Sequence, residues 1–365
     1  MIKTIGFPGR YLQGPDAVQH LPELLKEFLL LKPVVLMDDL VRASVGDLLL
    51  KPLSVAGIET TVLRFAGECT SEAIEQLASE ADQTQSDVVI GYGGGKTIDA
   101  AKGIAKAHDL RLIIVPTIAS NDSPTSRLIV LYDDQHRVTR VDRLTRNPDI
   151  VLVDTSIIAR APARFFAAGL GDALSKKFEA TQCHLAGGLN FFGTQSLSTA
   201  RLLAERCYET IIEFGLPALK QIREYGTPNE SVERAIEASV LLSGLGFESG
   251  GLSLSHALTR GFSAHPVMST FLHGETVAFG SIVQLVAEDR SQVDIQAHID
   301  FCHALNLPIS LAQLGAENAT DDEILQMATL TAAAPYIRNL TPNADAHRIA
   351  QCIRTADALG HASIK

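Results

Sequence analysis

Short apolar runs alternate with helix-forming stretches over the first 155 residues of the chain, and this alternation limits the folds available to it. The runs are rich in Val, Ile and Leu and cover residues 33–39, 60–65, 87–93, 110–117 and 148–154. Between them, residues 41–53, 71–83 and 96–108 place apolar side chains at helical spacing. Strands that read as continuous apolar runs and alternate with helices are typical of a parallel sheet covered on both faces. We therefore predict an N-terminal α/β domain.

The pattern changes after about residue 155, where strand signals nearly vanish. A β-ribbon is predicted just before this point, with RLIVLYD turning at Asp133-Asp134 towards HRVTRVD. Long helical patterns then follow, and they cover residues 189–214, 231–247, 275–290, 293–306 and 344–360. Prolines such as Pro217 are expected mostly at the breaks between helices. We predict two domains that share a cleft, a Rossmann-like parallel-sheet domain of residues 1–160 and an all-helical domain of residues 161–365.

The composition describes a globular protein with a net negative charge. Hydrophobic residues make up 46% of the chain and charged residues 20%, so disorder is not indicated. A formal net charge of -11, without a cluster of Lys and Arg, argues against a nucleic-acid partner and an anionic membrane. The five cysteines lack any C-x-x-C spacing, which suits a reducing compartment. Since we find no apolar stretch of roughly 18 residues, we expect a cytoplasmic protein without a membrane span.

A glycine-rich loop follows the third of the predicted strands and opens a helix, within GYGGGKTIDAAKGIA at residues 91–105. Backbone N–H groups and the helix dipole hold phosphate groups at such a junction. The loop matches neither standard nucleotide pattern, because Lys96 stands where G-x-G-x-x-G needs Gly and Ile90 where a Walker loop needs Gly. Three consecutive glycines at 93–95 still allow a ligand to approach the backbone closely. A tight turn without a ligand is the alternative.

Acidic residues at the end of the first predicted strand and on the helix after the glycine loop are candidates for binding or structural roles. Asp38 ends the first predicted strand, where a carboxylate can accept hydrogen bonds from both ribose hydroxyls and repel a 2′-phosphate, favouring NAD over NADP. Asp39 competes for this role, and a helix N-cap is the alternative for Asp38. On the helix after the glycine loop, Asp99 and Lys102 are interpreted as a solvated ion pair.

A polar loop and two histidines complete the candidate site. The loop VPTIASNDSPTS, residues 115–126, follows another strand end, where open α/β sheets bind ligands, so a ligand-lining role is favoured over an ordinary loop. His256 follows a Gly-Gly break, and His273 opens a helical stretch. Both imidazoles can reach a shared point from neighbouring helices, although a hydrogen-bonded core role is the common alternative for an isolated histidine.

Five motifs in this order resemble the glycerol dehydrogenase branch of the iron-containing alcohol dehydrogenase superfamily, whose fold is that of dehydroquinate synthase. The motifs are GGGKTIDAAK, VPTIASNDSPTS, APARFFAAGLGDALSKKFEA, GFESGGLSLSHAL and FLHGETVAFG. The resemblance implies a dinucleotide-binding α/β domain, a helical domain and an active site in the cleft between them. It also implies a homo-oligomer.

The resemblance implies a metal site at Asp172, His256 and His273. One carboxylate and two imidazoles leave a fourth position open for substrate, as in a catalytic zinc site. The iron-dependent branch of the superfamily carries a further His four residues after the Asp, where this chain has Lys176. The expected ion is therefore Zn2+, with another divalent ion such as Fe2+ also possible. His265 is not expected to be a ligand.

The implied activity is the NAD-dependent oxidation of a small polyol, glycerol to dihydroxyacetone, by hydride transfer from a metal-bound alkoxide. Asp122 corresponds to the residue that binds the polyol. The implied NAD contacts are the ribose at Asp38, the pyrophosphate at Gly94, Gly95 and Lys96, with Thr117 and Ser120 nearby, and the nicotinamide side at Ser126, Leu128 and Tyr132. Water and the cofactor ribose both remain open as proton acceptors.

Three basic residues depart from the glycerol dehydrogenase pattern. Arg127 ends the polar loop where those enzymes usually have Ala, and Lys176 and Lys177 follow Asp172 where they often have a small residue and an aromatic. Solvated surface is the interpretation we favour for these cations. If two of them reach the cleft, the substrate carries a phosphate or carboxylate. The alternatives are therefore a related dehydrogenase of a phosphorylated or carboxylated hydroxy compound, a lyase that uses NAD transiently, and a catalytically silent binding protein.

Overall fold

A computed structural model describes residues 2–133 and 138–364, and its main sheet has six parallel strands in the order β1-β8-β5-β4-β2-β3. The strands are β1 (Arg10–Gly14), β2 (Pro33–Asp38), β3 (Thr61–Phe65), β4 (Val88–Gly93), β5 (Arg111–Pro116) and β8 (Ile150–Asp154). The predicted parallel sheet is confirmed, and five of its strands are those that the apolar runs indicate. β1 was not predicted, because its residues are only half-buried and it pairs with β8 alone at the edge of the sheet.

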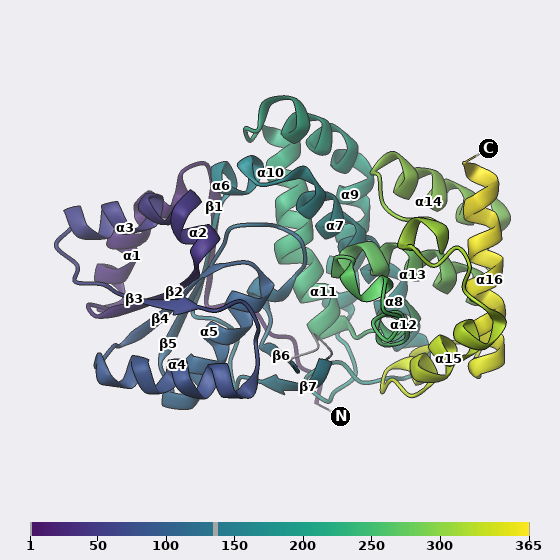
Figure 1. Cartoon of the computed structure of the whole chain (residues 1–365), viewed down its shortest axis with the longest axis horizontal. Coiled ribbons are helices and arrows are strands. Elements are labelled where there is room, and N and C mark those ends of the chain that lie inside the picture. Colours follow the sequence, from purple (N-terminus) through teal and green to yellow (C-terminus); the bar gives the residue numbers. More distant parts are fainter. Residues whose placement is uncertain (1, 134–137, 365) are drawn as a thin grey trace.

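Helices cover both faces of this sheet (Figure 1). Alternate residues of β2 enter two separate cores, with Val34 and Leu36 in one and Val35 and Met37 in the other. One face is covered by α1 (Leu21–Glu27), α2 (Asp39–Ser44) and α3 (Gly46–Val55), and the other by α4 (Ser71–Gln83) and α5 (Gly95–His108). The helix predicted at 41–53 is thus two helices, separated at Val45 by a non-helical backbone.

The predicted ribbon is a separate two-stranded antiparallel sheet, formed by β6 (Leu128–Tyr132) and β7 (Val138–Arg143). Its predicted turn at Asp133-Asp134 lies partly outside the described residues, which resume at Val138.

A buried ion pair on α5 holds this ribbon. The Lys102 Nζ donates to Asp99 Oδ1 at 3.0 Å and to the carbonyl oxygens of Ser123 and Leu128, both at 2.8 Å. The other Asp99 oxygen accepts the backbone N–H of Val130. Both side chains are buried, so the interpretation of a solvated pair was wrong. Residues distant in the sequence supply the acceptors that allow this burial.

The second half of the described chain is helical. Its α-helices are α6 (Thr155–Arg160), α7 (Ala163–Leu174), α8 (Lys176–Leu185), α9 (Ser198–Tyr225), α10 (Glu230–Ile236), α11 (Ser243–Gly250), α12 (Leu254–Phe262), α13 (His273–Ala287), α14 (Gln292–Ala304), α15 (Asp321–Ala332) and α16 (Ala346–Ser363). The π-helical segment η3 (Glu237–Leu242) joins α10 to α11. The described residues of both halves also contain short 3-10 turns, which are η1 (Ala17–His20), η2 (Ser123–Thr125), η4 (Met268–Thr270), η5 (Ala312–Leu314) and η6 (Ile337–Asn339). The predicted combination of an α/β part and a helical part is confirmed.

Two details of the helical half differ from expectation. Pro217 lies inside α9, not at a break, and residues 189–197 precede that helix as a loop. Packing of α9 against α7, α8, α10 and α11 outweighs the hydrogen bond that proline removes. No helix in the described residues is both long and apolar enough to cross a membrane. The proposed domain boundary near residue 160 remains a prediction.

Candidate active site

Asp172, His256 and His273 lie close together, each from a different helix. Their ligand atoms all lie within 4.8 Å of one another. Asp172 Oδ1 is 3.2 Å from Nε2 of His256 and 3.8 Å from Nε2 of His273. Asp172 lies near the end of α7, His256 on α12, and His273 at the first position of α13. The fold thus assembles the three residues that the motifs indicated as ligands.

Glycine allows the helices that carry these residues to approach each other. A Cβ on Gly274, next to His273, would lie 1.8 Å from the carbonyl oxygen of Ala168 on α7. A Cβ on Gly171, next to Asp172, would lie 2.6 Å from the carbonyl oxygen of Gly274. Any side chain at either position would push α13 away from α7, so both glycines set the distance between the carboxylate and the imidazole.

A buried carboxylate orients His256. Glu179 Oε2 faces Nδ1 of His256 at 2.5 Å, and Glu179 Oε1 accepts the backbone N–H groups of Ser253 and His256. A carboxylate in this position fixes the ring and directs Nε2 towards Asp172. Glu179 was not among the residues predicted from the sequence. The available signal was its place seven residues after Asp172, two helical turns along the GDALSKKFEA motif.

Lys176 occupies the centre of this group. Its Nζ lies 2.6 Å from Asp172 Oδ1, 3.0 Å from His256 Nε2 and 3.2 Å from Asp122 Oδ2. Ser175, between α7 and α8, keeps a helical backbone conformation, so residues 172 and 176 face the same side one turn apart. The side chain of Lys176 is fully buried, so its interpretation as solvated surface was wrong.

Asp122 brings the polar loop into the same cluster. Its Oδ2 accepts a hydrogen bond from Ser243 Oγ at 2.7 Å in addition to its contact with Lys176. Burial, followed by the charge of Asp172, raises the pKa of Asp122. Burial acts in the same direction on Asp172, but Lys176 and the two imidazoles outweigh it and hold the pKa of Asp172 well below its usual range.

The two imidazoles differ in exposure and in charge environment. The side chain of His273 is 42% exposed and that of His256 only 9%, so the cluster opens to the surface at His273. Partial burial of the ring, together with the positive charges of His256 and Lys176, outweighs Asp172 and lowers the pKa of His273. Burial also opposes protonation of His256, but Glu179 and Asp172 raise its pKa to about 9. The His256 ring and the Lys176 ammonium therefore compete for the same carboxylate oxygen.

Arg127 and Lys177, the other two basic residues that differ from the glycerol dehydrogenase pattern, lie outside this cluster. The Arg127 side chain is 11% exposed, with its Nε 3.0 Å from Glu248 and its guanidinium 3.8 Å from the centre of the Phe192 ring. The surface interpretation was therefore wrong for Arg127 as well. Lys177 is 34% exposed and lies 3.5 Å from Glu205, in keeping with a surface role. All three basic residues that differ from the pattern therefore already have a carboxylate partner.

The residues expected around the dinucleotide lie at the carboxyl ends of neighbouring strands. Asp38 ends β2, and Gly94 is the N-cap residue of α5 directly after β4, where no side chain caps the helix. The strand order reverses between β2 and β4, since the chain continues from β2 to β3 on one side and from β4 to β5 on the other. Open parallel sheets bind ligands in the crevice at the carboxyl ends of the strands where the order reverses, which is between β2 and β4 in this sheet. One Asp38 oxygen accepts the backbone N–H of Val41, which shows the N-cap role, while Asp39 pairs with Arg64 on the surface.

The remaining predicted cofactor residues follow the same edge. Lys96 is 43% exposed, with Nζ 2.7 Å from Glu68 and 5.2 Å from the Tyr132 ring centre. Thr117 and Ser120 are buried in the loop after β5, and Leu128 and Tyr132 are half-buried on β6. The Ser126 hydroxyl donates to the carbonyl of Ser123 and so faces inward. Their roles in NAD binding remain predictions.

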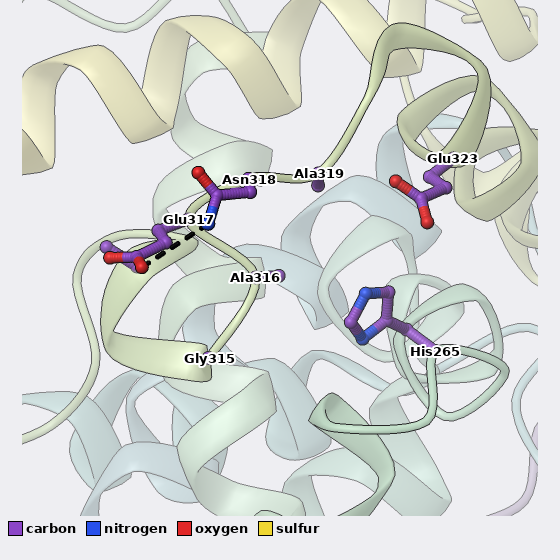
Figure 2. Close-up of a pocket in the computed structure, with 8 residues that line it drawn as sticks. His265, Gly315, Ala316, Glu317, Asn318, Ala319 and Glu323 are labelled. Carbon is purple, nitrogen blue, oxygen red and sulfur yellow. Dashed lines mark hydrogen bonds between the residues drawn. The ribbon is translucent and has the colours of Figure 1, made fainter.

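His265 lines a separate cavity of about 410 Å³ (Figure 2). Its lining includes Glu317 and Asn318, which are hydrogen-bonded to each other, and Glu323 across the cavity from them. The Glu323 carboxylate accepts the backbone N–H and hydroxyl of Thr320 and so caps α15. His265 is not part of the group that contains Asp172.

Comparison with known proteins establishes the family. The model for iron-containing alcohol dehydrogenases matches residues 8–155. A glycerol dehydrogenase of Thermotoga maritima is 41% identical over 90% of this chain and 89% of its own length. One from Pseudomonas putida is 39% identical, covering 99% of this chain and 98% of its own. The chain belongs to the iron-containing alcohol dehydrogenase family.

Within this family the chain groups with the glycerol dehydrogenases, as the motifs indicated. The solved structure of a glycerol dehydrogenase from Schizosaccharomyces pombe matches with a TM-score of 0.94 at 34% identity, over 99% of this chain and 92% of that one. The chain is therefore an oxidoreductase, and the two-part fold is that of the family.

Iron-containing alcohol dehydrogenases typically use NAD and a divalent metal ion. The donor types suit such an ion, and Asp172 Oδ2 is buried without a hydrogen-bond partner among the described residues. The space does not suit it, because the Lys176 ammonium lies within hydrogen-bond distance of both Asp172 and His256. An ion does not fit these residues while Lys176 keeps this position.

Proposed function

We propose that the chain is an NAD-linked polyol dehydrogenase and that glycerol, oxidised to dihydroxyacetone, is its substrate. The observation that carries this proposal is the buried cluster of Asp122, Asp172, Lys176 and His256, which opens at His273 and includes Asp122 from the loop after β5. The relatives at 41% and 39% identity described above are glycerol dehydrogenases, which supports the substrate class.

The charges in the cluster favour a neutral substrate. Asp122, Asp172 and Glu179 bring three carboxylates around Lys176. Arg127 is paired with Glu248, so it does not offer a free guanidinium to a phosphate or carboxylate. An anionic substrate would add a further negative charge to a buried site that already has an excess of them. The alternative of a phosphorylated or carboxylated hydroxy compound therefore has no structural support in these contacts.

The residues of the cluster give the substrate hydroxyl both donors and acceptors. Lys176 Nζ can donate to the oxygen at the carbon that reacts, and Asp122 can accept from the neighbouring hydroxyl, which selects vicinal diols. When bound, NAD accepts the hydride from that carbon. In balance, glycerol and NAD+ give dihydroxyacetone, NADH and one proton released to water.

The NAD preference rests on the sheet edge. The glycine loop at 93–95 and the uncapped N-terminus of α5 suit a pyrophosphate, and Asp38 would repel a 2′-phosphate. Zinc at Asp172, His256 and His273 remains a prediction. It requires the Lys176 side chain to leave the cluster, and no step above depends on it.

A substrate panel tests the proposal. Initial rates of NADH formation are measured with glycerol and 1,2-propanediol, and compared with glycerol phosphate and small hydroxy acids, each with NAD and with NADP. We expect the diols with NAD to give the highest kcat/KM. A strong preference for glycerol phosphate, or no net NADH from any alcohol, contradicts the assignment.

A further inference from the structure

We propose that the Lys176 ammonium takes the place of the metal ion, so that this enzyme works with a built-in organic cation. The part of this proposal that concerns catalysis rests on the proposed function, whereas the part that concerns metal content does not.

The contacts of Lys176 match the needs of an ammonium group. An ammonium has three N–H donors, and three polar atoms lie within 3.2 Å of Nζ, namely Asp172 Oδ1, Asp122 Oδ2 and His256 Nε2. The two carboxylates accept from the ammonium and supply the counter-charge that a buried cation needs. The site thus holds a positive charge next to Asp172 and His256, two of the three residues that were expected to hold the metal.

The same contacts exclude an ion beside Lys176. Asp172 Oδ1 and His256 Nε2 lie 3.2 Å apart, and Nζ is 2.6 Å and 3.0 Å from them. An ion at the usual ~2.0–2.2 Å from both atoms would lie within about 4 Å of Nζ, whatever its direction. Repulsion between a buried ammonium and a divalent ion at that distance opposes binding strongly.

Lys176 also has little freedom to leave. Its side chain is fully buried, and its Nζ lies 5.8 Å from the centre of the Phe247 ring. Its Cβ faces Gly246 of α11, where an added Cβ would lie 3.6 Å away. Withdrawal of Nζ would leave Asp122 and Asp172 without their shared cation in a buried position, which is costly.

An ammonium supplies the charge that the oxidation requires. As the C–H bond breaks, the hydride and its two electrons pass to NAD+, the carbon is oxidised, and the C=O bond forms. The O–H proton leaves for water. Negative charge on the substrate oxygen during this step is stabilised by an N–H donor of Lys176, which exchanges its longest contact, to Asp122, for the substrate.

The metal content of the protein tests directly whether the Lys176 ammonium replaces the ion. The wild-type protein is purified in the presence of Zn2+, passed through a desalting column, and its metal is measured by mass spectrometry. Lys176→Ala is measured beside it, because it removes the ammonium and keeps all three predicted ligands. Lys177→Ala is the matched control, since it changes the neighbouring surface lysine.

We expect much less than one ion per chain in the wild type and in Lys177→Ala, and about one in Lys176→Ala, with Zn2+ affinity at least ~100-fold higher by calorimetry. One tightly held ion per wild-type chain overturns the proposal, whether or not any variant folds. NADH formation that persists in a chelator supports the catalytic part, and activity that is lost in a chelator and restored by Zn2+ refutes it. A metal-free wild type that oxidises no alcohol contradicts the proposed function but still supports the replacement of the metal ion by Lys176.

Discussion

Two buried lysines in this molecule have similar local settings and different surroundings. Lys102 on α5 pairs with Asp99 three residues earlier, and Lys176 at the start of α8 pairs with Asp172 four residues earlier. Both side chains are fully buried. Lys102 also contacts the backbone carbonyls of residues 123 and 128 and, at 3.4 Å, the hydroxyl of Ser126. Lys176 instead contacts an imidazole and a second carboxylate.

This difference separates a lysine that stabilises the fold, Lys102, from one that we propose contacts the substrate, Lys176. Backbone carbonyls hold a lysine in place and cannot exchange it for a substrate, so Lys102 fixes the ribbon and the polar loop to α5. Side chains that come from separate elements can be shared with a ligand, and the cluster around Lys176 opens to solvent at His273. The acceptors of a buried cation therefore indicate its role better than its burial does.

Removal of the structural lysine should have the largest effect on stability. Lys102→Met leaves Asp99 as an unpaired buried carboxylate and should lower the free energy of unfolding by about 3–5 kcal/mol. Urea unfolding measures this change. The kcat/KM per folded molecule should fall by less than about tenfold, because Lys102 contacts Ser126 and Leu128 but not the cluster around Asp172. A loss of less than about 1 kcal/mol would show that the pair contributes little to the fold.

A change among the acceptors of Lys176 should affect catalysis more than stability. Asp122→Asn keeps an acceptor for Ser243 but removes one negative charge beside Nζ. We expect kcat/KM for glycerol to fall by about 10–100-fold, from the loss of one charge-assisted hydrogen bond of about 1.5–3 kcal/mol. Steady-state kinetics tests this result. Equal activity of variant and wild type would remove Asp122 from the substrate site.

A third buried ionisable group shows what happens without a charged partner. His298 is 2% exposed, its Nε2 lies 2.7 Å from Ser281 Oγ, and burial lowers its pKa from 6.5 to about 4. Since the unfolded chain takes up the proton first, this histidine reduces stability as the pH falls from about 6.5 to about 4. Between about pH 7 and about pH 5.5 the loss should be about 1 kcal/mol. Urea unfolding of the wild type and His298→Gln at both pH values measures it, and equal pH slopes would contradict it.

The surface lysine beside the site should matter least. Lys177→Ala removes an exposed ion pair with Glu205 and a contact with the Tyr208 ring. The free energy of unfolding should change by less than about 0.5 kcal/mol, and the kinetics should not change. A large kinetic effect in this variant would mean that α8 acts through both lysines, which would weaken the distinction between them.

Local patterns were enough to predict most of the sheet. The apolar runs indicated five strands, and α4 spans the predicted residues 71–83. Elements decided by distant contacts were missed. β1 is a short, half-buried strand that exists because it pairs with β8, far along the chain. α9 continues through Pro217 because four neighbouring helices pack against it.

The site shows the same limit. Motifs indicated Asp122, Asp172, His256 and His273, and the fold brings all four together. The position of Lys176 could not be inferred from its neighbours in sequence, because lysine is rarely buried without a partner. Its partners come from the polar loop and from α12, and only the folded chain places them around one atom.

The central claim is that the Lys176 ammonium belongs to the chemistry and the Lys102 ammonium to the scaffold. The most direct test is the initial rate of NADH formation from glycerol in a chelator, measured for the wild type, Lys176→Met and Lys102→Met at equal concentrations of folded protein. We predict turnover by the wild type and Lys102→Met, and a loss of at least ~100-fold in Lys176→Met, as for removal of a donor to a developing oxyanion. Equal rates for Lys176→Met and the wild type would contradict the account.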